Sequence, residues 1–258
     1  ISMVRSDTFF ADKWITYYGS QFGFENLYLF IDGLDQKLPS LSKKINCYQI
    51  PHVEHSRVKS DRKRSRYISK FACDLFAKYE IVLAMDIDEF LTVDPFQKIS
   101  LKDYLSRDFK SSSLSALGLD VGQHPNIEKP IDLSKPFLSQ RAFAQVSDRY
   151  TKPIITFKPL QWGSGFHRIK WKNFTIDNNL FLFHFGLVDL ANAKINAQNK
   201  HLLSLGWKGH FDRRFQLYEI IKTQNAQEGD YFFKKARIFF ATKRKWYAWN
   251  KPAPLKEN

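Results

Sequence analysis

The sequence predicts an α/β fold with a mostly parallel central sheet flanked by helices and a smaller mixed sheet in the C-terminal half. Two observations predict it. Over residues 1–90, apolar runs of strand length alternate with segments of helical periodicity, a pattern typical of parallel strands joined by helical crossovers. From residue 114 onward the apolar runs are shorter and are separated by Pro, Gly and Asn, which favours a mixed sheet with turns.

The first half contains four predicted strands and two predicted helices. The first helix carries an apolar stripe and ends at Gly23, and the second begins at Ser60 or Asp61 and carries a stripe that ends at Phe76. The last strand is a continuous apolar run, as expected for a strand covered on both faces. The strands are predicted at 1–4, 27–32, 45–50 and 81–85, and the helices at 8–23 and 60–76.

The second half contains strand-like pieces followed by two predicted helices and a basic, aromatic C-terminal segment. The domain organisation that follows is a main domain, 1–205, with a nucleotide-binding half, 1–110, and an acceptor-side half, 111–205. Residues 206–258 are predicted to form a C-terminal extension that is helical, basic and aromatic. The strand pieces are 114–121, 155–162, 169–176 and 180–187, the helices are 189–205 and 212–223, and the basic, aromatic segment is 231–258.

Composition limits the class of protein. The chain has 258 residues, of which 43% are hydrophobic and 16% aromatic, so it can bury a sizeable core. Cys47 and Cys73 form no CxxC pair and are interpreted as reduced thiols of a cytoplasmic protein. The formal net charge of +14 favours a polyanionic neighbour: nucleic acid, an anionic membrane face or a phosphorylated substrate.

The most informative stretch is LAMDIDEFL, in which Asp86, Asp88 and Glu89 directly follow an apolar strand. Carboxylates beside a buried strand require compensation. Two aspartates in a D-x-D pattern can present oxygens to one Mg²⁺ or Mn²⁺ ion, whose remaining ligands would be diphosphate oxygens and water. A helix N-cap or an acidic surface turn is the alternative. Strands of a parallel sheet bind ligands at their carboxyl ends, an edge that Arg5, Asp7 and Asp32 are also expected to reach.

The chain resembles the nucleotide-sugar glycosyltransferases of the GT-A fold, and is most similar to the family 2 and family 92-like groups. The resemblance covers about residues 2–200. The opening matches loosely, with Ser6-Asp7 where these families have Asn-Glu and with Lys13 where they have an acid before Trp14. Asp86-Ile87-Asp88-Glu89-Phe90 matches their D-x-D-E-F motif at every position, and a basic residue before an extended segment corresponds to Lys152 or Lys158.

The resemblance implies roles for these residues. Arg5, Asp7 and Asp32 would line the nucleotide pocket, Asp86 would contact both nucleotide and metal, and Asp88 would be the direct ligand of Mn²⁺ or Mg²⁺. A bound cation would stabilise the charge that develops on the departing nucleoside diphosphate.

Two histidines and two arginines are candidates beyond the motif. His184 leaves an apolar strand and is a candidate third metal ligand, whereas His167 is a candidate for acceptor binding; a hydrogen-bonded core histidine is the alternative for both. Arg62 and Arg66 belong with Lys63 and Arg64 to a basic cluster at the start of the second long helix, where these residues could meet phosphates. A charge run of this kind is also typical of a solvated helix face.

The acceptor side is less clearly marked. Sugar transfer with inversion needs a carboxylate base, for which Asp212 is the first choice and Asp120, Glu228 and Asp230 follow. Asp212 is equally explained as a helix N-cap. Trp162 and Trp207 could stack on a sugar ring or could anchor the core.

The function predicted is metal-dependent transfer of a sugar from a nucleotide-sugar donor to a glycan or glycolipid acceptor, with inversion, in the synthesis of a bacterial-type surface polysaccharide. We expect a cytoplasmic enzyme with peripheral contact to the anionic inner-membrane face, and no nucleic-acid partner. One alternative is a phosphatase of the haloacid dehalogenase type, although that chemistry requires a small hydroxyl residue at the position of Phe90. The other alternative is a polyanion-binding or nucleic-acid-binding protein, although the sequence contains no signature of a nucleic-acid-binding module.

Overall fold

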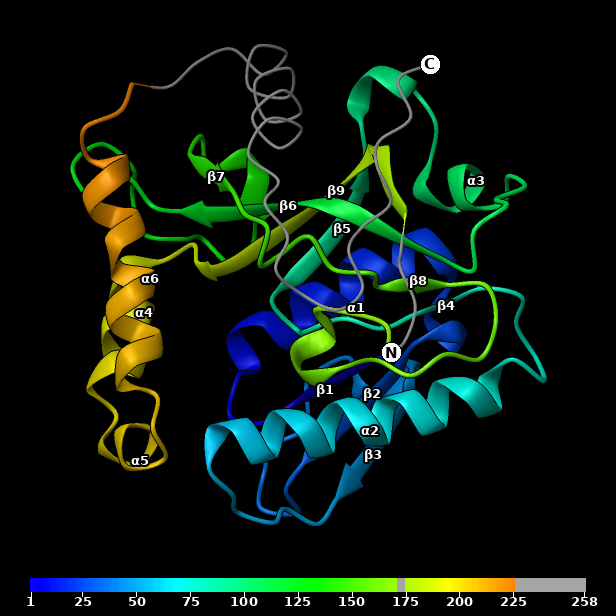
Figure 1. Cartoon of the computed structure of the whole chain (residues 1–258). Coiled ribbons are helices and arrows are strands. Elements are labelled where there is room, and N and C mark those ends of the chain that lie inside the picture. The colour runs from blue at the N-terminus through cyan, green and yellow to red at the C-terminus, as the bar shows by residue number, and fades with distance from the viewer. Residues whose placement is uncertain (171–174, 226–258) are drawn as a thin grey trace.

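A computed structural model describes residues 1–170 and 175–225 (Figure 1). The first part of the chain builds a parallel sheet in the order β1-β2-β3, in which Val4 pairs with Ile31 and Ile31 pairs with Gln49. Helix α1 follows β1, and helix α2 follows β3. The bounds are β1 (Ser2–Val4), α1 (Thr8–Phe22), β2 (Tyr28–Asp32), β3 (Asn46–Ile50) and α2 (Arg57–Leu75).

A second, mixed sheet of six strands has the order β4-β8-β6-β9-β5, with β7 paired to β6. The pair β6 and β9 is parallel, and the other pairs are antiparallel. The bounds are β4 (Val82–Leu83), β5 (Glu89–Val93), β6 (Ser113–Gly122), β7 (Ala144–Val146), β8 (Ile155–Thr156) and β9 (Thr175–Leu187).

The two sheets are joined where β1 meets β4. The backbone nitrogen of Ile1 donates to the carbonyl of Leu83 at 2.7 Å, and the backbone nitrogen of Met85 donates to the carbonyl of Ile1 at 3.2 Å. This alternation is the hydrogen-bond pattern of parallel neighbours. The Ser2 hydroxyl adds a bond to the carbonyl of Met85 at 2.9 Å. Strand β4 therefore continues the parallel arrangement on one side and begins the antiparallel sheet on the other.

The α/β class is confirmed, but the predicted proportions of the two sheets are wrong. The parallel sheet has three strands, and the mixed sheet has six and takes β4 and β5 from the N-terminal half. Residues 89–93 contain the apolar side chains of Phe90 and Leu91, which are buried, so the chain continues as a strand directly after the acidic motif. The predicted strand at 155–162 is also shorter, because only Ile155–Thr156 is a strand.

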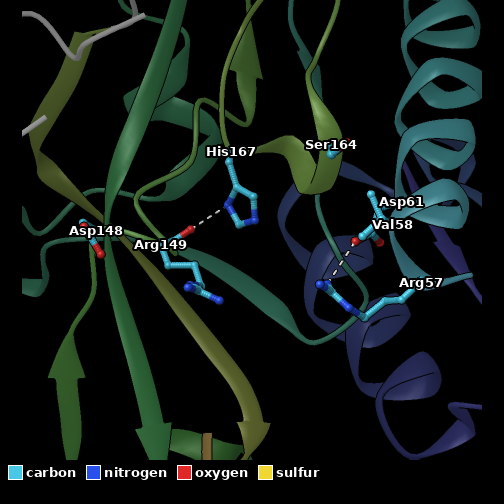
Figure 2. A pocket seen from close by; sticks show the side chains of 7 residues that line it. All are labelled: Arg57, Val58, Asp61, Asp148, Arg149, Ser164 and His167. Carbon is cyan, nitrogen blue, oxygen red and sulfur yellow. Dashed lines mark hydrogen bonds and ion pairs between the residues drawn. The ribbon is translucent and has the colours of Figure 1, made fainter. Parts of the chain in front are cut away.

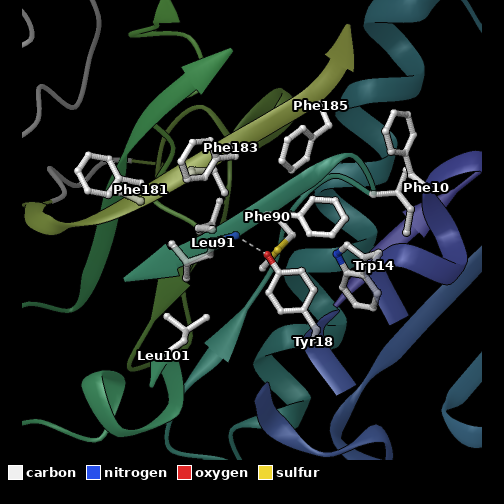
Figure 3. Packing of buried hydrophobic residues seen from close by; sticks show 14 of the residues in the cluster. Phe10, Trp14, Tyr18, Phe90, Leu91, Leu101, Phe181, Phe183 and Phe185 are labelled. Atoms are coloured by element: carbon white, nitrogen blue, oxygen red, sulfur yellow. Dashed lines mark hydrogen bonds between the residues drawn. The ribbon is translucent and has the colours of Figure 1, made fainter. Parts of the chain in front are cut away.

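The main core lies between α1 and the mixed sheet (Figure 3). Trp14 and Tyr18 of α1 face Phe90 of β5, whose ring meets that of Phe185 edge-on at a centroid distance of 5.1 Å. The Tyr18 hydroxyl accepts from the backbone nitrogen of Leu91 at 2.7 Å and donates to the carbonyl of Glu89 at 3.1 Å. Helix α1 is therefore attached to the strand that begins at the acidic motif.

Helix α2 belongs to a second hydrophobic cluster, in which Ile68 and Ala72 of the helix pack with Phe30 of β2 and with Trp162. It begins at Arg57, earlier than predicted. The predicted helix at 189–205 is divided at Asn199, whose side chain accepts from two backbone nitrogens of the next helix. The remaining helices are α3 (Leu101–Leu105), α4 (Leu190–Gln198), α5 (Lys200–Ser204) and α6 (Lys208–Ile221), and the 3-10 turns are Phe24–Asn26, Ser42–Lys44, Pro95–Gln97, Phe137–Ser139 and Ser164–Phe166.

Helix α6 packs against the mixed sheet beside α4 (Figure 1). Leu217 and Ile221 lie against Gly122 of β6, and the Tyr218 hydroxyl donates to the carbonyl of Leu187 at 2.8 Å. The basic, aromatic segment 231–258 lies outside the described residues. In the described part of the chain, no helix combines the length and the apolar character that crossing a bilayer requires.

Candidate active site

The acidic motif forms a closed turn between β4 and β5. The backbone nitrogen of Asp86 donates to Oε2 of Glu89 at 3.1 Å, and the backbone nitrogen of Glu89 donates to the carbonyl of Asp86 at 3.1 Å. The carbonyl of Asp88 accepts from the backbone nitrogen of Phe185 at 2.8 Å, which ties the turn to β9. Main-chain hydrogen bonds therefore fix the positions of all three acidic residues.

Two cations compensate Asp86 and Glu89. The Nζ atom of Lys152 lies 2.6 Å from Oδ2 of Asp86 and 2.6 Å from Oε1 of Glu89. The side chains of Lys152 and Glu89 are only 2% and 0% exposed. Nη1 of Arg64, from α2, lies 2.6 Å from the other oxygen of Asp86. Both oxygens of Asp86 are thus engaged by side chains of this protein.

The electrostatics of this group follow from burial and from the two cations. Burial alone would raise the pKa of Asp86, but Arg64 and Lys152 offset it and hold the pKa below its ordinary value. Burial raises the pKa of Glu89 to about 7, against the opposing effect of Lys152. The pKa of Lys152 is raised despite burial, because it faces two carboxylates. Lys152 is therefore a permanent buried charge.

Asp88 belongs to a second group with His184 and Asp120. Nε2 of His184 lies 3.1 Å from Oδ2 of Asp88, and Nδ1 of His184 lies 2.7 Å from Oδ1 of Asp120. The strands bring these residues together, because His184 of β9 is the register partner of Glu89 on one side and of Asp120 on the other. The Tyr150 ring lies parallel to the imidazole at a centroid distance of 3.7 Å.

Charge fixes the protonation of this second group. Burial would lower the pKa of His184, but Asp88 and Asp120 raise it to about 9. Burial would raise the pKa of Asp88, but His184 holds it well below its ordinary value. Asp7, at the start of α1, is close enough to Asp88 to be affected by it; burial and the charge of Asp88 raise the pKa of Asp7 to about 7.

The other residues predicted to bind nucleotide lie in two different places: two at the predicted edge of the parallel sheet and two on the surface of α2. Arg5 and Asp32 lie at the carboxyl ends of β1 and β2, as expected, where Nη1 of Arg5 donates to the carbonyl of Asp32 at 2.6 Å. Oδ2 of Asp32 lies 3.0 Å from Nδ1 of His52. Arg62 and Arg66 are exposed on α2, so the solvated-face interpretation fits them. Arg64, between them, is the arginine that reaches the acidic motif.

The acceptor-side predictions need correction at two positions. Asp212 is 61% exposed and pairs with Lys208 on α6 at 2.8 Å, so it has no contact with the acidic motif. Trp162 is 2% exposed and donates from Nε1 to the carbonyl of Pro153 at 2.7 Å, which makes it a core residue rather than a sugar platform. Asp120 does reach the site, but as the partner of His184. Glu228 and Asp230 lie outside the described residues.

A cavity of about 470 Å³ lies between α2 and the segments 148–149 and 164–167 (Figure 2). His167 lines it, with Nδ1 2.8 Å from the carbonyl of Arg149. Arg64 links it to the motif, because its guanidinium lies 3.5 Å from Asp61 and 2.6 Å from Asp86. Trp207 stands nearby, with the guanidinium of Arg57 5.8 Å from its ring centre. The lining residues are Arg57, Val58, Asp61, Asp148, Arg149, Ser164 and His167.

The sequence contained a usable signal for choosing Arg64 within the predicted basic cluster. Arg64 is four residues before the buried Ile68, so helical spacing directs it toward the core, whereas Arg62 and Arg66 are off that face. For Lys152 the resemblance offered Lys158 as an equal choice, and Lys158 is exposed. No local pattern singles out Arg214, whose pKa is raised against the effect of burial by Tyr150, Asp120 and Asp88.

The chain matches no protein-family profile, and no curated protein is significantly similar to it.

The side chains around Asp88, but not those around Asp86, suit the binding of a divalent cation. Nε2 of His184 and Oδ2 of Asp88 lie 3.1 Å apart, and both become metal ligands if a cation replaces the proton that Nε2 carries at the raised pKa of His184. Asp120 accepts from the far side of the ring, as carboxylates do behind metal-binding histidines. Asp86 does not fit as a ligand, because Arg64 and Lys152 already engage both of its oxygens. In the described ranges, no cluster of three or more His, Cys, Asp or Glu side chains has metal-binding geometry.

Proposed function

We propose that the protein is a metal-dependent glycosyltransferase that moves a sugar from a nucleotide-sugar donor to a glycan or glycolipid acceptor. The proposal rests on the contacts of His184 with Asp88 on one side of its ring and with Asp120 on the other. Asp88 lies in the turn that follows β4, and His184 and Asp120 are paired on the adjacent strands β9 and β6. This turn lies where the parallel sheet meets the mixed sheet, at the carboxyl end of β4. Ligands of open α/β sheets bind at such an edge.

Each residue of the site has a role in the proposed reaction. Asp88 and His184 would hold Mn²⁺ or Mg²⁺, with Asp120 orienting the imidazole. The bound cation would act as a Lewis acid on the leaving diphosphate. Asp86 and Glu89, neutralised by Lys152 and Arg64, would keep the turn rigid. Main-chain and side-chain contacts of this kind preorganise a site before substrate enters.

The cavity between α2 and the segments 148–149 and 164–167 is the proposed place of the acceptor and the transferred sugar. Its lining carries two arginines, two aspartates, a serine and a histidine, so it offers hydrogen-bond donors and acceptors suited to a ligand rich in hydroxyl groups. Inversion needs a carboxylate near the acceptor hydroxyl. Asp61 and Asp148 line the cavity and replace Asp212 as candidates for that base.

The test is thermal stabilisation by a panel of nucleoside diphosphates and nucleotide sugars, with and without Mn²⁺. A ligand that binds the folded state raises the unfolding midpoint by mass action. We expect one nucleotide class to raise the midpoint only when the metal is present, and Asp88→Asn to abolish the effect. Asp212→Asn, at an exposed position on α6, should behave as the wild type. A midpoint that no nucleotide moves would exclude the proposed activity.

The phosphatase alternative is less well supported. That chemistry uses the first aspartate of D-x-D as a nucleophile, whereas Lys152 and Arg64 engage both oxygens of Asp86. The phosphatase chemistry also requires a small hydroxyl residue at the position of Phe90, whose ring is part of the core. A polyanion-binding protein remains an outcome of the nucleotide panel, because the charge of +14 would support it without any metal dependence.

The proposed setting is the cytoplasmic face of the bacterial inner membrane, with a role in surface polysaccharide synthesis. Nucleotide sugars would be the donor pool, and lipid-linked or phosphorylated glycans would be the acceptors. The net charge of +14 supports attraction to such acceptors and to anionic lipid.

A further inference from the structure

Arg214 is a half-buried arginine whose position is specified by two neighbouring features. Its helix, α6, is held to the mixed sheet by the packing of Leu217 and Ile221 on Gly122. Its guanidinium lies directly against Gly186 of β9, so that a Cβ atom added there would collide with Nη2 and would stand 2.8 Å from Cζ. Gly186 therefore leaves the space that the guanidinium occupies, two residues after His184.

The guanidinium has hydrogen-bond donors without acceptors. Its Nε and Nη2 atoms are buried and have no hydrogen-bond partner among residues 1–170 and 175–225. An unpaired buried donor on a charged group destabilises the folded protein. An arrangement of this kind is expected where a ligand completes the hydrogen bonds.

The carboxylates near Arg214 change its pKa, but none of them forms an ion pair with it among the described residues. Tyr150, Asp120 and Asp88 raise its pKa against the effect of burial, and the charge of Arg214 in turn opposes the rise in the pKa of Asp7. The described residues form no ion pair with its nitrogens. Asp88 and Asp120 instead direct an oxygen each to His184. The Nε and Nη2 donors therefore remain available beside the proposed metal ligands.

We propose that Arg214 binds the diphosphate of the donor through Nε and Nη2. These two N–H groups form a planar fork that matches two oxygens of a phosphate group. Cations would then lie on two sides of the ligand, one at Asp88 and His184 and one at Arg214, which fits a diphosphate leaving group better than a monophosphate. Because carboxylates surround the site, an anion enters only together with the divalent cation that neutralises them. This inference rests on the proposed function.

The experiment uses inorganic pyrophosphate, which tests the phosphate contacts without assuming a base or a sugar. Affinity in the presence of Mg²⁺ is measured by titration on the full chain. We expect Arg214→Met to weaken pyrophosphate binding at least tenfold, since a charged hydrogen-bond pair is lost. Arg214→Lys, which keeps the charge and loses the fork, should fall in between. Arg213→Met, at the exposed neighbouring position, should bind as the wild type does.

A second variant guards against a folding defect in Arg214→Met. Gly186→Ala keeps the arginine and displaces its guanidinium, so it should weaken pyrophosphate binding by a similar factor. Wild-type affinity in both Arg214→Met and Gly186→Ala would overturn the inference and leave the glycosyltransferase proposal standing, provided that nucleotides still stabilise the wild type. If neither nucleotides nor pyrophosphate bind the wild type with metal, both proposals are wrong.

Discussion

Lys152 shows how one side chain can make an acidic turn compatible with a protein interior. Asp86 and Glu89 would be costly to bury as isolated charges. A single ammonium at 2.6 Å from each compensates both, and it is almost fully shielded from water itself. Breaking such an arrangement leaves a buried charge without a partner, which is far more destabilising than losing a surface ion pair.

Replacing Lys152 by methionine should therefore lower the free energy of unfolding by about 3–5 kcal/mol at pH 7, as measured by urea denaturation. Lys158→Met removes an exposed lysine six residues away and should change stability by less than about 0.5 kcal/mol. In the double variant Lys152→Met, Glu89→Gln the loss should be smaller than in Lys152→Met alone, because Glu89 is the carboxylate left without a cation, whereas Asp86 keeps Arg64. Equal stability of the Lys152 and Lys158 variants would contradict this account.

Asp7 predicts a pH dependence with a defined sign. Its pKa is raised from an ordinary value of about 4 to about 7, so between these values the folded protein holds a proton that the unfolded chain has lost. The contribution of Asp7 to stability is therefore complete below pH 4 and disappears as the pH rises through 7. Asp7→Asn removes this dependence.

We expect Asp7→Asn to gain about 1–3 kcal/mol relative to the wild type when the pH is raised from 4 to 8, because the asparagine cannot ionise next to Asp88. Urea unfolding at pH 4, 6 and 8 measures the difference. Asp108→Asn, at an exposed position, should show no such gain. A constant difference between Asp7→Asn and the wild type at all three pH values would contradict the assignment.

Three strands that are distant in the sequence assemble the row of site residues. Strand β9 lies between β5 and β6, and the register aligns His184 with Glu89 on one neighbour and with Asp120 on the other. A shift of one residue in either pair would turn the site side chains to the opposite face of the sheet. Strand β6 is also contacted closely by the backbone of Tyr150 and Thr151, which lies against Gly118.

Gly118→Ala tests how closely that loop must approach β6. An added Cβ would collide with backbone atoms of Tyr150 and Thr151 and would stand 2.6 Å from the carbonyl oxygen of Tyr150, which cannot move as a flexible side chain would. We expect destabilisation of about 1–3 kcal/mol, and a displaced Tyr150 ring that no longer covers His184. Calorimetry measures the first effect.

Gly209→Ala is the matched control. Gly209 is in the first turn of α6 with open space around it, where an alanine should be neutral or should stabilise the helix by up to about 1 kcal/mol. If both glycine variants unfold at the wild-type midpoint, the close approach of the loop to β6 is not required for stability.

The whole molecule carries a formal charge of +14, but its site is a concentration of carboxylates that Lys152, Arg64 and His184 compensate. The excess positive charge must therefore act elsewhere on the molecule. Surface charge of this magnitude attracts anionic partners over about a Debye length, and salt screens the attraction.

We expect the protein to bind vesicles rich in phosphatidylserine and to leave vesicles of phosphatidylcholine unbound, as measured by co-sedimentation. Binding should fall steeply as ionic strength is raised above the physiological range. Addition of Mn²⁺ and nucleotide should leave it unchanged, because the site and the surface charge are separate features. Equal binding to both kinds of vesicle, independent of salt, would contradict an electrostatic contact.

The sequence by itself determined the local elements and the acidic motif. Alternating apolar and helical patterns identified β1, α1, β2, β3 and α2, because periodicity depends only on neighbouring residues. The motif was visible because its charges directly follow an apolar run. Only the tertiary structure decided which groups face that motif. The pairing of β5 with β9, the choice of Lys152 over Lys158 and the approach of Arg214 past Gly186 depend on strand register and on contacts between residues that are far apart in the chain, and these leave no local pattern.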